Sequence, residues 1–251
     1  YDYGFSPKFP DKVEKEANKI SKEISKDEVS KRLDIRKTTT FTIDPKDAKD
    51  FDDALSVKKL KNGNWEVGVH IADVSHYVKK GGIIDTEAIE RATSVYLVDR
   101  VIPMLPEVLS NNICSLKPNV DRLAYSILFE MDELANMLNY TIKKTVIHSD
   151  VRFTYQTAQD VIDNKEGKLV TELLLLDKLS KILRDKRQQN GSINFESTEV
   201  KFILDKNNNP IDVYFKESLS TNHLIEEFML LANKTVAKHI GFPTKDAKTF
   251  V

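Results

Sequence analysis

Five aspartates crowd into residues 42–55, a stretch whose other side chains are mostly apolar or β-branched and read as β-strand. They are Asp44, Asp47, Asp50, Asp52 and Asp53. Carboxylates held together beside a hydrophobic core repel one another and lose hydration, which is costly unless a cation compensates. The chain must therefore fold so that this charge is either solvated or neutralised by a bound ion.

The residue types of this cluster favour a hard metal ion. Carboxylate oxygens with no cysteine and no adjacent histidine suit Mg²⁺ or Mn²⁺ better than Zn²⁺. Along an extended strand Asp50 and Asp52 point to one face and Asp53 to the other. A bulge, or a loop that brings in Asp44, is therefore needed for all four to meet one ion. Metal held by carboxylates with open positions is suited to phosphoryl chemistry.

A solvated turn is the alternative interpretation of the same residues. Pro45-Lys46-Asp47 reads as a turn, and Asp47 is assigned to it rather than to the metal site. An EF-hand is excluded, because no glycine follows the acidic cluster and Ala54 stands where an oxygen ligand would be required.

The aspartates lie at the open end of a predicted β-hairpin. Residues 54–60 form one strand, Asn62-Gly63 supplies the turn, and the return strand from Trp65 to Ala72 alternates strictly. His70, near the end of the return strand, is either a base or ligand or a hydrogen-bonded strand histidine, and the second interpretation is preferred. Cys114 has no activating neighbour in sequence and is predicted to be a core thiol.

The remaining periodicities predict an α+β domain with a mixed, largely antiparallel sheet and packed helices. A charged helix with one narrow apolar stripe is expected over residues 11–26. The other predicted strands are 122–131, 137–148, 193–195, 200–204 and 211–215, and the other main helices are 153–164, 169–189 and 223–240.

Composition excludes several classes of protein. With 40% hydrophobic residues among 251, the chain can bury a substantial core and is not disordered. A single cysteine rules out an internal disulfide and suits a reducing, cytoplasmic compartment, and no apolar run is long enough to span a membrane. The net charge of -1 argues against a protein that coats nucleic acid electrostatically. Composition does not determine the oligomeric state.

Five segments in this order resemble the catalytic (RNB) domain of the ribonuclease II and ribonuclease R family, and within it bacterial ribonuclease R most closely. They are 42–45 with 50–54, 70–75, 102–106, 109–116 and 223–233. The resemblance covers residues 38–251 and implies an RNB-type domain that is incomplete at its C-terminus. Residues 1–37 then correspond to a linker and surface helix leading from a preceding domain.

The resemblance implies a hydrolytic 3′→5′ exoribonuclease that acts processively on single-stranded RNA and releases 5′-nucleoside monophosphates. Asp44, Asp50 and Asp53 match the family positions that hold Mg²⁺ against the scissile phosphate. Asp52 matches the aspartate on which turnover depends most, through a second metal or the attacking water. Because later family motifs lie beyond residue 251, the fragment alone is expected to be weakly active or inactive.

The resemblance also implies four RNA contacts. Tyr96 matches a residue that stacks near the 3′ end, Tyr155 the residue that holds the terminal nucleotide, and Phe195 an aromatic that closes the stacked run. Glu226 matches a carboxylate that selects RNA over DNA through a ribose hydroxyl, with Glu227 as its rival. Two other functions stay open: an RNA-binding module that has lost hydrolysis, and a metal-dependent hydrolase of a non-RNA phosphodiester.

Overall fold

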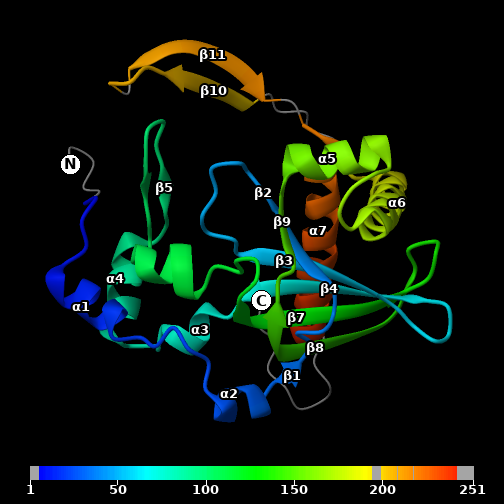
Figure 1. The fold of residues 1–251 in the computed structure, drawn as a ribbon, viewed down its shortest axis with the longest axis horizontal. Coiled ribbons are helices and arrows are strands. Elements are labelled where there is room, and N and C mark those ends of the chain that lie inside the picture. The colour runs from blue at the N-terminus through cyan, green and yellow to red at the C-terminus, as the bar shows by residue number, and fades with distance from the viewer. Residues whose placement is uncertain (1–5, 194–198, 208, 217, 242–251) are drawn as a thin grey trace.

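The computed structural model describes residues 6–193, 199–207, 209–216 and 218–241. Its centre is a seven-stranded sheet, with helices packed on both faces and two separate two-stranded ribbons beside it (Figure 1). The α+β class predicted from the sequence is confirmed. Among the helices of these ranges, none combines the length and the apolar character that crossing a membrane requires.

The sheet consists of β1 (Leu33–Asp34), β2 (Thr40–Asp44), β3 (Asp53–Lys59), β4 (Trp65–Ala72), β7 (Asp121–Met131), β8 (Met137–His148) and β9 (Val151–Thr154). Its strand order is β1-β8-β7-β4-β3-β2-β9. The two outermost pairs, β1–β8 and β2–β9, are parallel, and all pairs between them are antiparallel. The sheet is therefore mixed and largely antiparallel, as expected.

The other elements surround this sheet (Figure 1). The helices are α1 (Asp11–Asn18), α2 (Lys26–Ser30), α3 (Val74–Tyr77), α4 (Ile83–Arg91), the π-helical turn η1 (Leu109–Ile113), α5 (Tyr155–Asn164), α6 (Val170–Gln189) and α7 (Ser220–Gly241). One ribbon pairs β5 (Val95–Tyr96) with β6 (Val101–Ile102), and the other pairs β10 (Glu199–Leu204) with β11 (Pro210–Lys216).

The two faces of the sheet are buried in different ways. Large side chains such as Val69 and Phe129 pack against α5, α6 and α7 in the main core. On the opposite face the strands carry smaller residues, including Ala54 and Ala124, which pack with residues of α1, α4 and η1. Cys114 belongs to this second core, and burial raises the pKa of its thiol to about 12, which confirms the prediction of a core thiol.

A chain of hydrogen bonds crosses the second face of the sheet around His70. Its Nδ1 lies 2.6 Å from the Ser126 hydroxyl and its Nε2 lies 2.8 Å from the Ser56 hydroxyl. The ring is fully buried, and this burial lowers its pKa to about 3. Gly68 makes room for it, because a Cβ there would lie 2.7 Å from the ring. These contacts support the hydrogen-bonded strand histidine and not a base or ligand.

The N-terminal segment departs from the single helix predicted over residues 11–26. Helix α1 ends at Asn18, and α2 begins only at Lys26, so that prediction is wrong. Residues 19–25, predicted as helix, lie outside both helices, and the Ser25 side chain accepts a hydrogen bond from the Glu28 backbone N–H, which starts α2 as a separate helix. The stripe itself is real, because Val13 and Ala17 are fully buried.

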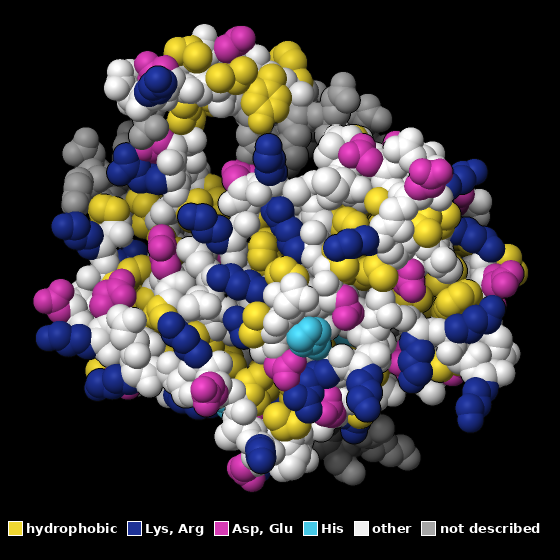
Figure 2. Space-filling view, viewed as in Figure 1, with side chains coloured by type: hydrophobic (Ala, Val, Ile, Leu, Met, Phe, Trp, Pro, Cys, Tyr) yellow, Lys and Arg dark blue, Asp and Glu magenta, His cyan; other side chains and the backbone are white. Residues whose placement is uncertain are grey.

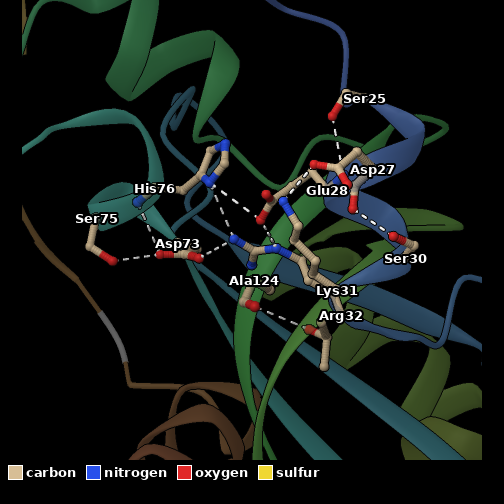
Figure 3. A network of polar contacts seen from close by, with 11 residues as sticks. Ser25, Asp27, Glu28, Ser30, Lys31, Arg32, Asp73, Ser75, His76 and Ala124 are labelled. Atoms are coloured by element: carbon tan, nitrogen blue, oxygen red, sulfur yellow. Dashed lines mark hydrogen bonds and ion pairs between the residues drawn. The ribbon is translucent and has the colours of Figure 1, made fainter.

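A buried ion pair ties this segment to the sheet (Figure 3). The Arg32 guanidinium lies 2.7 Å from the Asp73 carboxylate, and both side chains are almost completely buried. Arg32 also donates to Glu28 on α2. Asp73, at the end of β4, caps α3 by accepting from the His76 backbone N–H. Leu33 and Asp34 then extend the sheet as β1, so this connection is held at two successive points.

Candidate active site

The acidic residues occupy the turn between two neighbouring antiparallel strands. Asp44 is the last residue of β2 and Asp53 the first residue of β3, and residues 45–52 between them form no regular structure. In an antiparallel pair the end of one strand lies beside the start of the next. Asp44 and Asp53 therefore lie next to each other at the same end of β2 and β3. Asp50 and Asp52 lie in the irregular segment, so strand alternation does not force them apart. This satisfies the requirement for a loop that the sequence imposed.

Backbone contacts fix the second half of this loop. The Ser115 hydroxyl donates to the Lys49 carbonyl at 2.8 Å and accepts from the Phe51 N–H at 3.0 Å. The Leu116 N–H donates to the Phe51 carbonyl at 2.8 Å. Phe51 itself is buried in the second core. The backbone around Asp50 and Asp52 is thus anchored to the segment that follows η1.

Arg152 holds the first half of the loop and was not predicted from the sequence. Its guanidinium donates to the carbonyls of Pro45 and Lys46, at 2.6 and 3.0 Å, and lies 5.5 Å from the centre of the Phe51 ring. Arg152 reaches these groups because β9 runs parallel to β2, with Arg152 opposite Thr42. Nothing local in the sequence indicates that β9 pairs with β2. The available signal for Arg152 was its position, two residues before Thr154-Tyr155.

The carboxylates carry unbalanced negative charge. Burial raises the pKa of Asp53 to about 7, and the charges of Asp44 and Asp52 add to the rise. Burial likewise raises the pKa of Asp44 to about 6, with the Thr42 hydroxyl and then Arg152 opposing the rise and Asp50 and Asp52 adding to it. The pKa of Asp52 is raised by limited hydration and by Asp50. The four predicted ligands therefore lie close enough to repel one another, as the sequence suggested.

Two predicted RNA contacts lie beside these carboxylates. Tyr96 projects from β5, is 69% exposed, and its pKa is raised by partial burial and by the charges of Asp50 and Asp52. Tyr155 opens α5 directly after its cap, Thr154. Burial raises the pKa of Tyr155 to about 12, with Asp53 and Asp44 adding to the effect. The fold thus brings together residues from distant parts of the chain.

One hollow lies beside the acidic loop, and of the four predicted ligands Asp50 lines it. It has a volume of about 1030 Å³, and its walls include Asp50, Tyr96 and Tyr155. The β10–β11 ribbon contributes Phe202, Tyr214 and Phe215 to the same walls. The space-filling view shows hydrophobic side chains on this ribbon, which arches over an opening in the surface (Figure 2). Both strands of the ribbon were predicted from the sequence, but their aromatic residues were not identified as part of a site.

Of the other two predicted RNA contacts, the structure describes only Glu226, which is not part of this cluster. Glu226 lies on α7, where its carboxylate is 3.4 Å from Arg187, and it does not line the hollow formed by the described residues. Glu227, the alternative candidate for this contact, is buried and forms an ion pair with Arg187. This ion pair links α6 and α7. Phe195 lies outside the described residues.

The donor set of the acidic cluster suits Mg²⁺ in its chemistry. All candidate ligands are carboxylate oxygens, and one of them, Asp44 Oδ2, is buried without a hydrogen-bond partner. A cation would satisfy this oxygen and balance the repulsion described above. Across the described ranges, however, no three His, Cys, Asp or Glu side chains are arranged to hold an ion as they stand. The residue types suit Mg²⁺, but their side chains would have to move to coordinate it.

Comparison with known proteins places this site in a family. The model of the RNB domain matches residues 32–247. Ribonuclease R of Thermotoga maritima is 46% identical over 244 residues, which is 94% of this chain and 34% of that protein. The chain spans between 22% and 36% of the length of the curated relatives it is compared with.

Solved structures agree with this assignment. Mycoplasma genitalium RNase R in complex with ribose-methylated single-stranded RNA superposes with a TM-score of 0.85 at 33% identity, covering 92% of this chain and 36% of that one. Yeast Ssd1, described as a pseudonuclease, has a TM-score of 0.69 at 16% identity over 88% of this chain and 27% of its own, a likeness of fold alone. Because the family model covers most of the sequence, the chain belongs to the RNB domain family.

Proposed function

We propose that this chain is the catalytic part of a Mg²⁺-dependent exoribonuclease that hydrolyses single-stranded RNA processively from its 3′ end and releases 5′-nucleoside monophosphates. Mn²⁺ is an acceptable substitute in such an oxygen-ligand site. The observation that carries the proposal is that Asp50, Tyr96 and Tyr155 line one hollow, while the charges of neighbouring aspartates raise the pKa values of Asp44, Asp52 and Asp53. The names of the relatives, ribonuclease R among them, supply the reaction class.

Each side chain has a role in this proposal. Asp44, Asp50 and Asp53 would hold the ion, and Asp52 would orient the attacking water or share a second ion. Bound Mg²⁺ would stabilise the charge that develops on the attacking and leaving oxygens at phosphorus. Arg152 keeps the loop in place through the carbonyls of Pro45 and Lys46, so it acts through the backbone and not on the substrate.

The RNA contacts follow from exposure and position. Tyr96 presents an exposed ring beside Asp50, suited to stacking on a base near the 3′ end. Tyr155 lies beside Asp53 and Asp44 and would hold the terminal nucleotide. Phe195 is proposed to stack further along the strand. Selection of RNA by Glu226 requires its carboxylate to leave Arg187 for a ribose hydroxyl. The buried Cys114 thiol suits a reducing, cytoplasmic setting.

A binding module without hydrolysis is the second candidate. The observation in its favour is that no three suitable side chains of the described ranges already form an ion site. Against it stands the cost of keeping Asp44 and Asp53 together in a partly buried place, which the binding of RNA alone does not require. A hydrolase of another phosphodiester would share the metal site but would not need contacts to the ribose hydroxyl.

The test uses a 5′-labelled single-stranded RNA with Mg²⁺ and the complete gene product containing this sequence. We expect stepwise shortening from the 3′ end in the wild type and loss of shortening in Asp52→Asn, with RNA binding retained. Binding without shortening in the wild type would favour the module. Equal decay in the variant would show that the assigned site is wrong, and equal decay of the matched DNA would favour the broader hydrolase.

A further inference from the structure

The β10–β11 ribbon has an apolar face along its regularly paired length. Strand alternation and the register Val200 opposite Phe215 and Phe202 opposite Val213 put these four apolar side chains on the same side. A bulge between Ile203 and Leu204, where Leu204 lies opposite Pro210, ends this regular alternation. The other face includes Ile203, Asp212 and Tyr214. A two-stranded ribbon is marginally stable alone, and such a face usually marks a contact surface.

The described part of the chain leaves this face largely uncovered. Phe215 is 65% exposed, Val213 is 49% exposed and Phe202 is 45% exposed. Of the four, Phe202 and Phe215 line the hollow that also contains Asp50, and Tyr214 reaches it from the ribbon's other face. The aromatic residues of the ribbon, rather than its aliphatic ones, are therefore those that line the hollow.

The chemistry of the hollow points to the class of ligand. Among the described residues its cations are Lys46, Lys49 and Arg100, and Arg100 is paired with Asp99. That leaves two lysines near the acidic loop for phosphates, whereas other parts of the lining offer aromatic rings from two ribbons. A ligand with flat apolar groups on a chain of phosphates matches both kinds of lining residue, which describes single-stranded nucleic acid. The volume, about 1030 Å³, is at the upper limit of small-molecule sites and has room for more than one base.

We propose that Phe202 and Phe215, with Tyr214 beside them, form a second stacking platform for bases on the 5′ side of the nucleotide that reaches the carboxylates. The inference rests on the proposed function, because it takes the strand's 3′ end to lie at Asp50 and its neighbours. It assigns the β10–β11 ribbon to RNA and not to a protein partner, since the residues facing the acidic hollow are aromatic.

Binding of labelled RNA by this chain in EDTA tests the platform without hydrolysis. We compare a trinucleotide with a fifteen-nucleotide single strand, using fluorescence anisotropy. Because stacking on one aromatic contributes about a 5- to 150-fold change in affinity, the double variant Phe202→Ala, Phe215→Ala should weaken binding of the long strand at least tenfold. The trinucleotide, which reaches only the acidic end, should bind equally well. Ile211→Ala is the matched control, an exposed apolar residue of the same ribbon that does not line the hollow.

Two further measurements separate stacking from apolar contact. Phe202→Tyr keeps a flat ring and should bind as the wild type does, whereas Phe202→Leu keeps the apolar area and should not. A 2-aminopurine placed at successive positions from the 3′ end should lose its quenching in the alanine variants at the platform positions only. Circular dichroism establishes that each variant is folded.

The outcomes distinguish the platform from the proposed function. A long strand that binds the double variant as tightly as the wild type overturns the platform and leaves the face for a protein partner. Equal affinity of the tyrosine and leucine variants does the same. If the wild type binds neither RNA, the failure lies with the proposed function, and the platform falls with it.

Discussion

Replacing Asp53 with asparagine should stabilise the metal-free protein, although the residue belongs to the candidate active site. The folded chain raises the pKa of Asp53 to about 7 from its ordinary 3.8, by burial first and then by Asp44 and Asp52. Between these two values the folded state binds more protons than the unfolded state. The free energy of unfolding therefore falls as the pH rises through this window. Asparagine cannot ionise and removes the penalty.

The size of the effect follows from the shift. One pKa unit corresponds to about 1.4 kcal/mol, so the full difference would be about 4 kcal/mol at pH 8. Because Asp44 and Asp52 share the same repulsion and relax when one charge is removed, we expect a gain of roughly 1–3 kcal/mol. At pH 5 the gain should be smaller, since Asp53 of the folded wild type is then mostly protonated.

Urea unfolding, followed by the fluorescence of the single tryptophan, Trp65, measures this difference. Wild type and Asp53→Asn are compared in EDTA at pH 5 and pH 8, and again at pH 8 with Mg²⁺. The ion should stabilise the wild type more than the variant, because it binds the folded carboxylates. Asp47→Asn, an exposed aspartate of the same loop, is the control and should change little. A variant less stable than the wild type at pH 8 in EDTA would refute the reasoning, as would a gain independent of pH.

Two other substitutions probe the supports of the site. Gly68→Ala should destabilise the protein by about 1–3 kcal/mol in urea unfolding, because its Cβ would lie 2.3 Å from the Ser56 hydroxyl and force the buried strands to shift; an unchanged midpoint would contradict this. Arg152→Gln should lower Mg²⁺ affinity about 10- to 100-fold by releasing the carbonyls of Pro45 and Lys46. Calorimetric titration measures that affinity, and a wild-type value in the folded variant would exclude a positioning role.

Local pattern was sufficient to predict the parts of the fold that form from neighbouring residues. The alternation from Trp65 to Ala72 and the turn at Asn62-Gly63 describe one hairpin, so the sequence alone places the acidic loop at its open end. The apolar stripe of α1 was equally visible. Its continuation to residue 26 was not correct, because α1 ends at Asn18 and a separate helix starts at Lys26 behind its own Ser25 cap.

Contacts between distant segments could not be predicted in this way. Arg152 is 107 residues from Pro45, and only the parallel pairing of β9 with β2 brings them together. The same limit applies to Phe202 and Phe215, whose strands were predicted while the hollow they face was not. The roles of Asp44 and Tyr155 came from resemblance to a family; the structure adds that their side chains share one electrostatic environment.

The position of the acidic loop depends on its backbone rather than on its carboxylates. Ser115 and Arg152 bind carbonyl and N–H groups of the loop, and Phe51 anchors it in the core. None of these contacts uses a carboxylate oxygen, so the aspartates are held together in spite of their repulsion. A cluster stabilised by its own ion pairs would have its oxygens occupied. Here the contacts of the surrounding fold offset the unfavourable free energy of holding the carboxylates together. Asp44 Oδ2 has no hydrogen-bond partner and is therefore available to a cation. We therefore expect that removal of the Mg²⁺ proposed to bind here reduces stability without unfolding the domain.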